Sequence, residues 1–257
     1  MPRMRPRLSA LSDEHLEHGS HDVDPAWFRQ DDADIAVLAG DVHRYDRAIS
    51  FVSRIGLPAV YMPGNHEFYG ADMPTARAEL ARRAERAGVH LLDPGTAVIE
   101  IRGVRVRFIG ATLWTDYALY GPDTVQKSKI NARAMMNDHR LIRYDGRVFT
   151  PDDAERLHRE QKAYIAEALA TPHDGPSVVV THHAPSIRCQ PAQYNDSPIA
   201  PAFCSNLEDF VAEIGADVWI CGHTHGDCDF TLGKTRVVSN QHGYDGEKPV
   251  AMKLIDL

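Results

Sequence analysis

Residues 61–70 read YMPGNHEFYG, and their first residue, Tyr61, is the last of an apolar run, residues 57–61, that has the composition of a buried strand. Pro63 and Gly64 end this run, and the chain then presents an amide, an imidazole and a carboxylate side by side in Asn65, His66 and Glu67. A plain turn would need only the glycine and the asparagine. The additional side chains indicate a functional site whose other members must come from elsewhere in the chain.

The composition is that of a soluble globular protein: 257 residues, 43% hydrophobic and 25% charged. The net charge of -8 gives no general attraction to nucleic acid or to an anionic membrane, so neither is a favoured partner. No run of about 18 apolar residues occurs, and the basic N-terminus has too short an apolar stretch for a signal peptide. The four cysteines form no C-x-x-C pair. We expect one cytoplasmic domain over residues 1–257; the oligomeric state is not indicated.

The hydrophobic pattern alternates between strands and helices, which predicts an α/β fold. Strands are expected at residues 8–12, 34–38, 59–62, 178–180, 218–221, 230–232, 236–239 and 250–255, with a hairpin at 98–101 and 104–109. Helices are expected at 45–55, 75–87, 127–136, 207–214, and from a Thr150 cap to about residue 170. Segments 13–31 and 184–204 are expected to be polar loops. The strand–helix–strand order with short joints predicts parallel strands.

Polar clusters follow five of the predicted strands. They are Ser12-Asp13-Glu14-His15, Gly40-Asp41, Gly64-Asn65-His66-Glu67, Thr181-His182-His183 and Cys221-Gly222-His223-Thr224-His225. Ligands of open α/β sheets bind outside the carboxyl ends of the strands. We therefore expect these five clusters to converge on one site.

The donors in these clusters fit two metal ions. In an extended chain, residues two apart face the same side, so Asp13 with His15, and His223 with His225, can each present two donors together. The candidate ligands are two carboxylates, one amide oxygen and four imidazoles: Asp13, Asp41, Asn65, His15, His182, His223 and His225. Such a set suits Mn, Fe, Zn or Ni, and the choice among them stays open. Two divalent ions exceed the charge of two carboxylates, so a phosphate ester would be attracted to this centre.

The order of these motifs resembles that of the calcineurin-like metallophosphoesterase superfamily, in the form of its uncharacterised bacterial members. That family carries D-x-H, G-D, G-N-H-[ED], a later H, and G-H-x-H. Here the motifs read Asp13-Glu-His15, Gly40-Asp41, Gly64-Asn-His-Glu67, His182 and Gly222-His-Thr-His225. They span residues 13–225, nearly the whole chain. The resemblance implies a four-layer α/β/β/α sandwich of two mixed β-sheets, with a dimetal site at the carboxyl ends of the strands.

The resemblance also implies how the ligands divide. Asp13, His15, Asp41 and His225 would hold one metal ion, and Asp41, Asn65, His182 and His223 the other, so that Asp41 bridges them. A hydroxide held between the ions would attack phosphorus. His66 would be catalytic, as a proton donor to the leaving group or a stabiliser of the transition state, and Glu67 would orient the loop or a ligand.

The implied function is a metal-dependent phosphoesterase acting on a small or nucleotide-like phosphate ester, with a phosphodiester favoured and a phosphomonoester possible. The alternative is a non-catalytic scaffold or metal-binding relative on the same fold, which the complete ligand set disfavours. A metallo-β-lactamase-type hydrolase is excluded because Cys228 stands where its H-x-H-x-D-H signature needs a final histidine. Segments 115–149 and 184–204 are expected to form the walls that set specificity, and Arg140 is a candidate phosphate clamp there.

Overall fold

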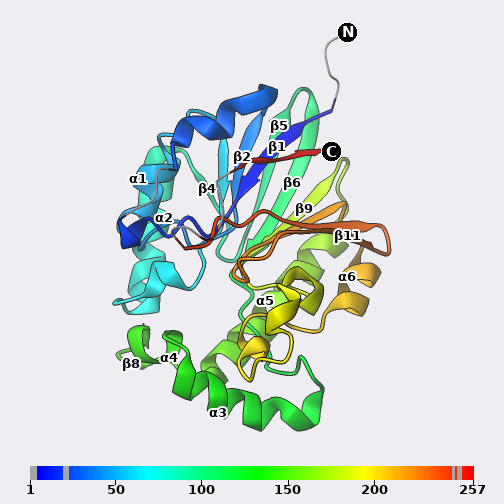
Figure 1. The fold of residues 1–257 in the computed structure, drawn as a ribbon. Coiled ribbons are helices and arrows are strands. Elements are labelled where there is room, and N and C mark those ends of the chain that lie inside the picture. The colour runs from blue at the N-terminus through cyan, green and yellow to red at the C-terminus, as the bar shows by residue number, and fades with distance from the viewer. Residues whose placement is uncertain (1–4, 20–22, 245–246, 248–250) are drawn as a thin grey trace.

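The computed structural model describes residues 5–19, 23–244, 247 and 251–257, and its core is a pair of packed β-sheets (Figure 1). The first sheet has the strand order β13-β1-β2-β3-β4 and the second β11-β12-β10-β9-β6-β5. The first comprises β1 (Arg7–Leu11), β2 (Ile35–Leu38), β3 (Ala59–Tyr61), β4 (His90–Leu91) and β13 (Lys253–Asp256). The second comprises β5 (Gly95–Ile101), β6 (Val104–Ala111), β9 (Ser177–Thr181), β10 (Val218–Cys221), β11 (Cys228–Leu232) and β12 (Thr235–Ser239).

Both sheets are mixed. Strands β1 to β4 are parallel and β13 is antiparallel to β1. In the second sheet β6, β9, β10 and β12 are parallel, while the edge strands β5 and β11 are antiparallel to their neighbours. The parallel strands of each sheet therefore end at one edge, where the segments that follow them meet.

The strands alternate between two buried layers. In β2, Ile35 and Val37 face the other sheet, whereas Ala36 and Leu38 pack on the side that carries the helices α1 (Ala48–Val52) and α2 (Met73–Ala87). Helices α5 (Pro151–Ala170) and α6 (Glu208–Ile214) cover the outer face of the second sheet (Figure 1). Each buried Val or Ile contributes about 1.5–3 kcal/mol to the core. The predicted four-layer α/β/β/α sandwich is confirmed.

Helix α5 begins at the predicted cap. The Thr150 hydroxyl accepts a hydrogen bond from the Asp153 N–H, and the Asp153 carboxylate accepts one from the Thr150 N–H. Pro151 occupies the first turn, where its missing N–H costs nothing. Arg147 adds two hydrogen bonds to the same carboxylate, at 2.6 and 2.7 Å. These contacts fix the start of the longest helix in the described part of the chain.

Several predicted boundaries were wrong. The helix expected over residues 45–55 is confined to α1, because a turn and a left-handed Gly56 follow it. The segment 13–31, expected to be a loop, contains 3-10 turns at Leu16–His18 and Pro25–Asp32, the second begun by an Asp24 cap. The strand expected over 250–255 begins at Lys253, and residue 250 lies outside the described residues. Strand β4 and the hairpin of β7 (Arg143–Tyr144) and β8 (Arg147–Val148) were missed, because two residues carry no periodicity.

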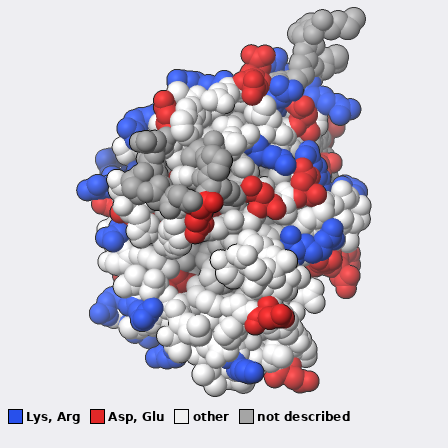
Figure 2. Space-filling model, viewed as in Figure 1, with Lys and Arg blue, Asp and Glu red and all other residues white. Residues whose placement is uncertain are grey.

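The remaining elements lie near the carboxyl ends of the strands. They are α3 (Val125–Met135), α4 (Asp138–Leu141) and the 3-10 turns His66–Phe68, Pro122–Thr124, Ile187–Cys189, Ala192–Tyr194 and Ala200–Ala202. Figure 2 shows a broad area with few charged side chains over the middle and lower part of one face, with Lys and Arg mostly around it. In the described residues no helix is long and apolar enough to cross a membrane. The cytoplasmic location stays a prediction.

Candidate metal centre

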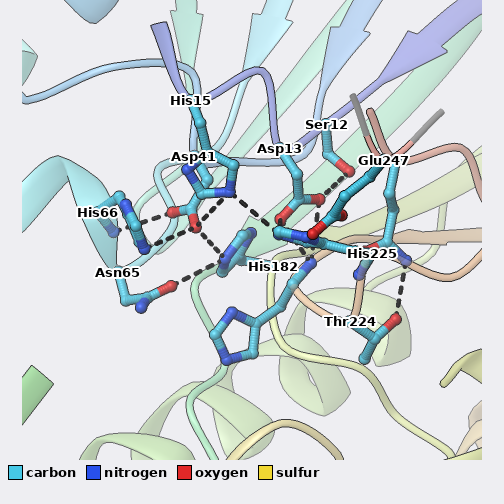
Figure 3. Close-up of polar contacts among 12 residues, drawn as sticks. Ser12, Asp13, His15, Asp41, Asn65, His66, His182, Thr224, His225 and Glu247 are labelled. Carbon is cyan, nitrogen blue, oxygen red and sulfur yellow. Dashed lines mark hydrogen bonds and ion pairs between the residues drawn. The ribbon is translucent and has the colours of Figure 1, made fainter. Parts of the chain in front are cut away.

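The predicted ligands come from loops that follow five strands of the two sheets. Asp13 and His15 follow β1, Asp41 follows β2, and Asn65 follows β3; His182 follows β9, and His223 and His225 follow β10. Because β1, β2 and β3 belong to one sheet and β9 and β10 to the other, the loops meet at the rim of the sandwich, where the carboxyl ends of both sets of parallel strands lie. Their side chains point toward one another (Figure 3).

The backbone at these loops differs from the extended chain that the sequence reasoning assumed. Asp13, His15, Asp41, His223 and His225 all have positive φ, between 46° and 73°. A non-glycine residue in this left-handed region is strained. Side chains two positions apart therefore converge through tight turns, and His223 and His225 point into different groups of donors.

The first group consists of Asp13, His15 and His225, whose donor atoms lie within 4.8 Å of one another. His15 Nε2 lies 3.1 Å from His225 Nε2, and His225 Nε2 lies 3.7 Å from Asp13 Oδ1. The His223 N–H donates to both oxygens of Asp13 at 3.0 and 3.1 Å, which fixes that carboxylate. Three donors of types that bind divalent cations thus face one point.

The second group consists of Asp41, His182 and His223, again within 4.8 Å. Asn65 belongs beside it, because its Oδ1 lies 3.0 Å from His182 Nε2. His182 is held on its other side, where Nδ1 lies 2.8 Å from the Ala39 carbonyl oxygen. A backbone partner of this kind fixes the orientation of a metal-binding histidine.

Asp41 lies between the two groups. Its Oδ2 is 3.2 Å from His182 Nε2 and 3.8 Å from His15 Nε2, so it reaches one member of each. Its Oδ1 accepts the His66 N–H at 2.9 Å. Burial opposes ionisation, but the positive charges of His182 and His66 hold the pKa of Asp41 well below its usual range. The carboxylate is therefore an anion shared by both groups.

His223 shows that the donor set fits a cation. The residue is 5% exposed, and its Nε2 atom is buried without a hydrogen-bond partner among the described residues. Burial and the neighbouring His183 lower its pKa well below the usual range, so the ring is neutral and offers a lone pair. A buried imidazole nitrogen with no partner is costly unless something binds it. Neutral imidazoles and carboxylates are the donors that Mn, Fe, Zn and Ni accept.

Glu67 braces the loops, as the sequence suggested. Its buried carboxylate accepts hydrogen bonds from the N–H groups of Asp41, Val42 and Gly64, at 2.8–3.0 Å, and from the Tyr61 hydroxyl at 2.7 Å. These four bonds tie the loop after β2 to the loop after β3. Glu67 therefore positions the backbone of Asp41 without facing the donors.

His66 forms a contact that the sequence reasoning missed. Its Nδ1 lies 2.7 Å from Glu17 Oε1, and the same oxygen lies 3.3 Å from His15 Nδ1. Burial alone would lower the pKa of His66, but the charges of Asp41 and Glu17 raise it to about 9. Glu17 lies in a segment that was expected to be a solvated loop, and no motif marked it.

Two further residues orient Asn65. Its Nδ2 donates to Asp138 Oδ1 at 2.8 Å, and the Tyr69 hydroxyl donates to the same oxygen at 2.7 Å. With the amide nitrogen engaged in this way, Oδ1 faces His182. Asp138 is 73 residues from Asn65, so sequence spacing gave no signal for this pair.

At the opposite end of the site, His225 is held by residues near the C-terminus. Its Nδ1 lies 2.8 Å from Glu247 Oε2 (Figure 3), and its N–H donates to Gln241 Oε1. The Tyr244 ring stacks on His15 with ring centroids 4.6 Å apart. Neither Gln241 nor Glu247 belongs to one of the sequence motifs.

A cavity of about 660 Å³ opens over the donors. Its floor includes His15, Asp41, Asn65, His66, His223 and His225. Its walls come from both segments that the sequence singled out: Met135, Met136 and Asn137 from one, and residues from Gln190 to Phe203 from the other. Among the described residues, no Lys or Arg lines it. The size is that of a small-molecule site.

The other sequence candidates lie outside the donor groups. His183 Nδ1 lies 3.1 Å from the Thr112 carbonyl oxygen. Arg140 is exposed, donates to Asn137 Oδ1 and does not line the cavity, so the structure offers no support for a phosphate clamp there.

The sequence model of the calcineurin-like phosphoesterase family matches residues 7–227, which include every predicted ligand. The chain belongs to the calcineurin-like phosphoesterase family. Membership supports a hydrolase that acts on phosphate esters. The predicted family is thereby confirmed.

Other relatives agree with this fold. An uncharacterized protein of Acanthamoeba polyphaga mimivirus is 27% identical over 271 residues, covering 94% of this chain and 92% of its own. The phosphopantetheinyl hydrolase of Mycobacterium tuberculosis superposes with a TM-score of 0.76 at 18% identity, covering 98% of this chain and 96% of its own. A putative 5'-nucleotidase of Staphylococcus aureus gives a TM-score of 0.52 at 15% identity, covering 93% of this chain and 49% of its own. At these identities the two structures show the fold alone.

Proposed function

We propose that this protein is a metal-dependent phosphoesterase of one domain, residues 1–257, that uses two divalent cations. Asp13, His15, Asp41 and His225 would hold one cation, and Asp41, Asn65, His182 and His223 the other. The observation that carries the proposal is the pair of donor groups with Asp41 between them. Manganese is the first ion to test, because the set mixes hard carboxylate and amide oxygens with imidazoles.

The cations would supply Lewis-acid chemistry: they polarise the phosphoryl oxygens and lower the pKa of water. The chain's own residues position the reaction. Glu17 engages His66 at Nδ1, which leaves Nε2 for the cavity that His66 lines. His66 can there hold a proton for the leaving oxygen.

The cavity favours a phosphodiester over a phosphomonoester. A diester carries one negative charge, whereas a monoester carries up to two at neutral pH, and an anion not met by the cations would need Lys or Arg. The described lining contains no Lys or Arg. It includes instead the apolar side chains of Met135, Met136, Ile199 and Phe203. We therefore propose a small phosphodiester whose leaving group is neutral and partly apolar. The two superposed proteins, a phosphopantetheinyl hydrolase and a putative 5'-nucleotidase, are compatible with a small phosphate ester.

The test compares two chromogenic esters. Metal-stripped protein is given Mn²⁺ and assayed with bis(p-nitrophenyl) phosphate and p-nitrophenyl phosphate. We expect Mn²⁺-dependent hydrolysis, with the larger kcat/KM for the diester. His66→Ala should lower kcat by about 100-fold or more, and His90→Ala, an exposed histidine on β4, should not change it.

Three results would count against the proposal. A larger kcat/KM for the monoester would refute the diester preference and leave the phosphoesterase intact. Equal rates of hydrolysis with and without metal would refute the metal dependence. No hydrolysis of either ester with Mn, Fe, Zn or Ni would favour the non-catalytic alternative.

A further inference from the structure

Three of the four cysteines meet outside the metal centre. Cys189 ends the 3-10 turn Ile187–Cys189, Cys221 ends β10 and Cys228 begins β11. Their sulfur atoms lie within 4.8 Å of one another, and none takes part in a disulfide. Cys189 and Cys221 are buried, and Cys228 is partly exposed. The group shares no residue with the donors described above.

The sheet register explains why these side chains meet. Ser239 of β12 is the paired residue of Cys221 on one side and of Cys228 on the other. Paired residues on neighbouring strands project from the same face of a sheet, so Cys221, Ser239 and Cys228 form a row. Cys189 packs with Cys221 and Cys228 in the hydrophobic cluster on the outer face of this sheet. Sequence spacing could not show this, because no two of the cysteines form a C-x-x-C pair.

The geometry fits one metal ion. An ion about 2.3 Å from each of three sulfurs, as in zinc–thiolate sites, holds the sulfurs about 3.8 Å apart. The observed limit of 4.8 Å lies within a small side-chain adjustment of that value. The Ser239 hydroxyl is 3.3 Å from Cys228 Sγ and provides an oxygen beside the three sulfurs.

The chemistry of the group also fits a thiophilic ion. Thiolates select Zn²⁺ and Cu⁺ over hard ions such as Mn²⁺. The partly exposed Cys228 gives an ion a route to the two buried sulfurs.

We propose that Cys189, Cys221 and Cys228 form a structural zinc site, separate from the phosphoesterase centre. Binding displaces the thiol protons to solvent, so affinity rises with pH. The ion would join three segments that carry parts of the active site. Cys221 lies two residues before His223. The Cys189 carbonyl accepts a hydrogen bond from the Thr224 hydroxyl at 2.6 Å, and Gln190 and Pro191, which follow Cys189, line the cavity.

The test uses Co²⁺ as a spectroscopic probe on the full-length, reduced protein. Thiolate bound to Co²⁺ gives a charge-transfer band in the near ultraviolet, whereas the nitrogen and oxygen donors of the other centre give none. We expect this band in the unmodified protein and expect Zn²⁺ to abolish it by displacement. Cys189→Ser and Cys228→Ser should lose the band, and Cys204→Ser should retain it, because that buried thiol lies outside the group.

A second readout does not depend on the variants' folding. In the unmodified protein, Zn²⁺ should slow alkylation of Cys228 by iodoacetamide at least ten-fold, while Mn²⁺ should leave the rate unchanged. No charge-transfer band and no slowing by Zn²⁺ in folded, reduced protein would overturn the proposal. A band that persists in both Cys189→Ser and Cys228→Ser would also overturn it.

Discussion

Replacing Gly64 by alanine is a precise disturbance of the proposed dimetal centre. A Cβ atom built on Gly64 would lie 2.1 Å from Asp41 Oδ1 and 2.7 Å from the His182 ring. Gly64 has no positive φ, so alanine meets no backbone strain there and the clash alone decides the outcome. Both threatened side chains belong to the second donor group.

The size of the effect follows from these distances. Ordinary contacts begin near 3.4 Å, so Asp41 Oδ1 would have to retreat by about 1 Å. A misplacement of that size in a catalytic group can cost about 100-fold in rate. Asp41 is proposed to serve both cations, so we expect Gly64→Ala to lose at least one bound Mn²⁺ and to lower kcat/KM by about 100-fold or more.

The assay measures Mn²⁺ content and diester hydrolysis for Gly64→Ala beside Gly70→Ala. Gly70 lies six residues further on, has a φ of +78° and would place its Cβ in open space. Its alanine should cost about 1 kcal/mol of stability through backbone strain, yet keep full metal content and activity. Normal activity in Gly64→Ala with two bound Mn²⁺ would refute the reasoning, since it would show that Asp41 and His182 do not need their observed positions.

Three further substitutions test the surroundings of the site and the fold. Glu17→Ala should lower kcat at saturating Mn²⁺ by about 10-fold or more, because His66 loses its Nδ1 partner, and Glu17→Gln should recover part of that loss; saturating Mn²⁺ is needed because Glu17 also contacts the proposed ligand His15, and equal rates for all three proteins would contradict this role. Asp138→Ala should weaken Mn²⁺ binding about 10-fold, since the Asn65 amide loses its acceptor; an unchanged Mn²⁺ affinity in titration calorimetry would contradict this. Asp153→Asn should lower the free energy of unfolding at pH 7 by about 1–2 kcal/mol. Burial would raise the pKa of Asp153, but its hydrogen bonds lower it to about 2 in the folded protein. The stabilisation by the ionised carboxylate is therefore complete above the pKa of Asp153 in the unfolded chain, and it is lost as the pH falls through about 2. Urea unfolding should show the difference shrinking by about half at pH 3, and a constant difference would disprove it.

The sequence pattern was sufficient for most of the strands and for the donors that follow them, whereas the four-layer arrangement was implied by the family resemblance. A continuous apolar run such as Ile35–Leu38 of β2 predicts a strand buried on both faces, and parallel strands bring their following loops to one edge. The polar clusters lie directly after these strands, so their convergence could be expected without knowing the strand pairing. The ligand assignments themselves stay predictions, to which the structure adds distances.

Contacts between distant segments could not be predicted in the same way. Glu17 and Asp138 reach the site from segments without a motif, and each is recognised only by the side chain that it holds. The left-handed turns at Asp13 and His223 were missed because the loops are shaped by bonds across the molecule, such as the His223 N–H to Asp13. The secondary-structure propensity of a residue is a weak guide where tertiary contacts of this kind determine the backbone conformation.

Equilibrium binding of Mn²⁺ to metal-stripped protein tests the central claim most directly, because a hard ion should ignore the cysteine group. The two donor groups that meet at Asp41 predict two Mn²⁺ per chain, with hydrolysis of the diester appearing as both sites fill. Asp41→Asn should lose tight binding at both sites together, since its carboxylate serves each group. One Mn²⁺ or none per unmodified chain, or two in Asp41→Asn with full activity, would contradict the dimetal account.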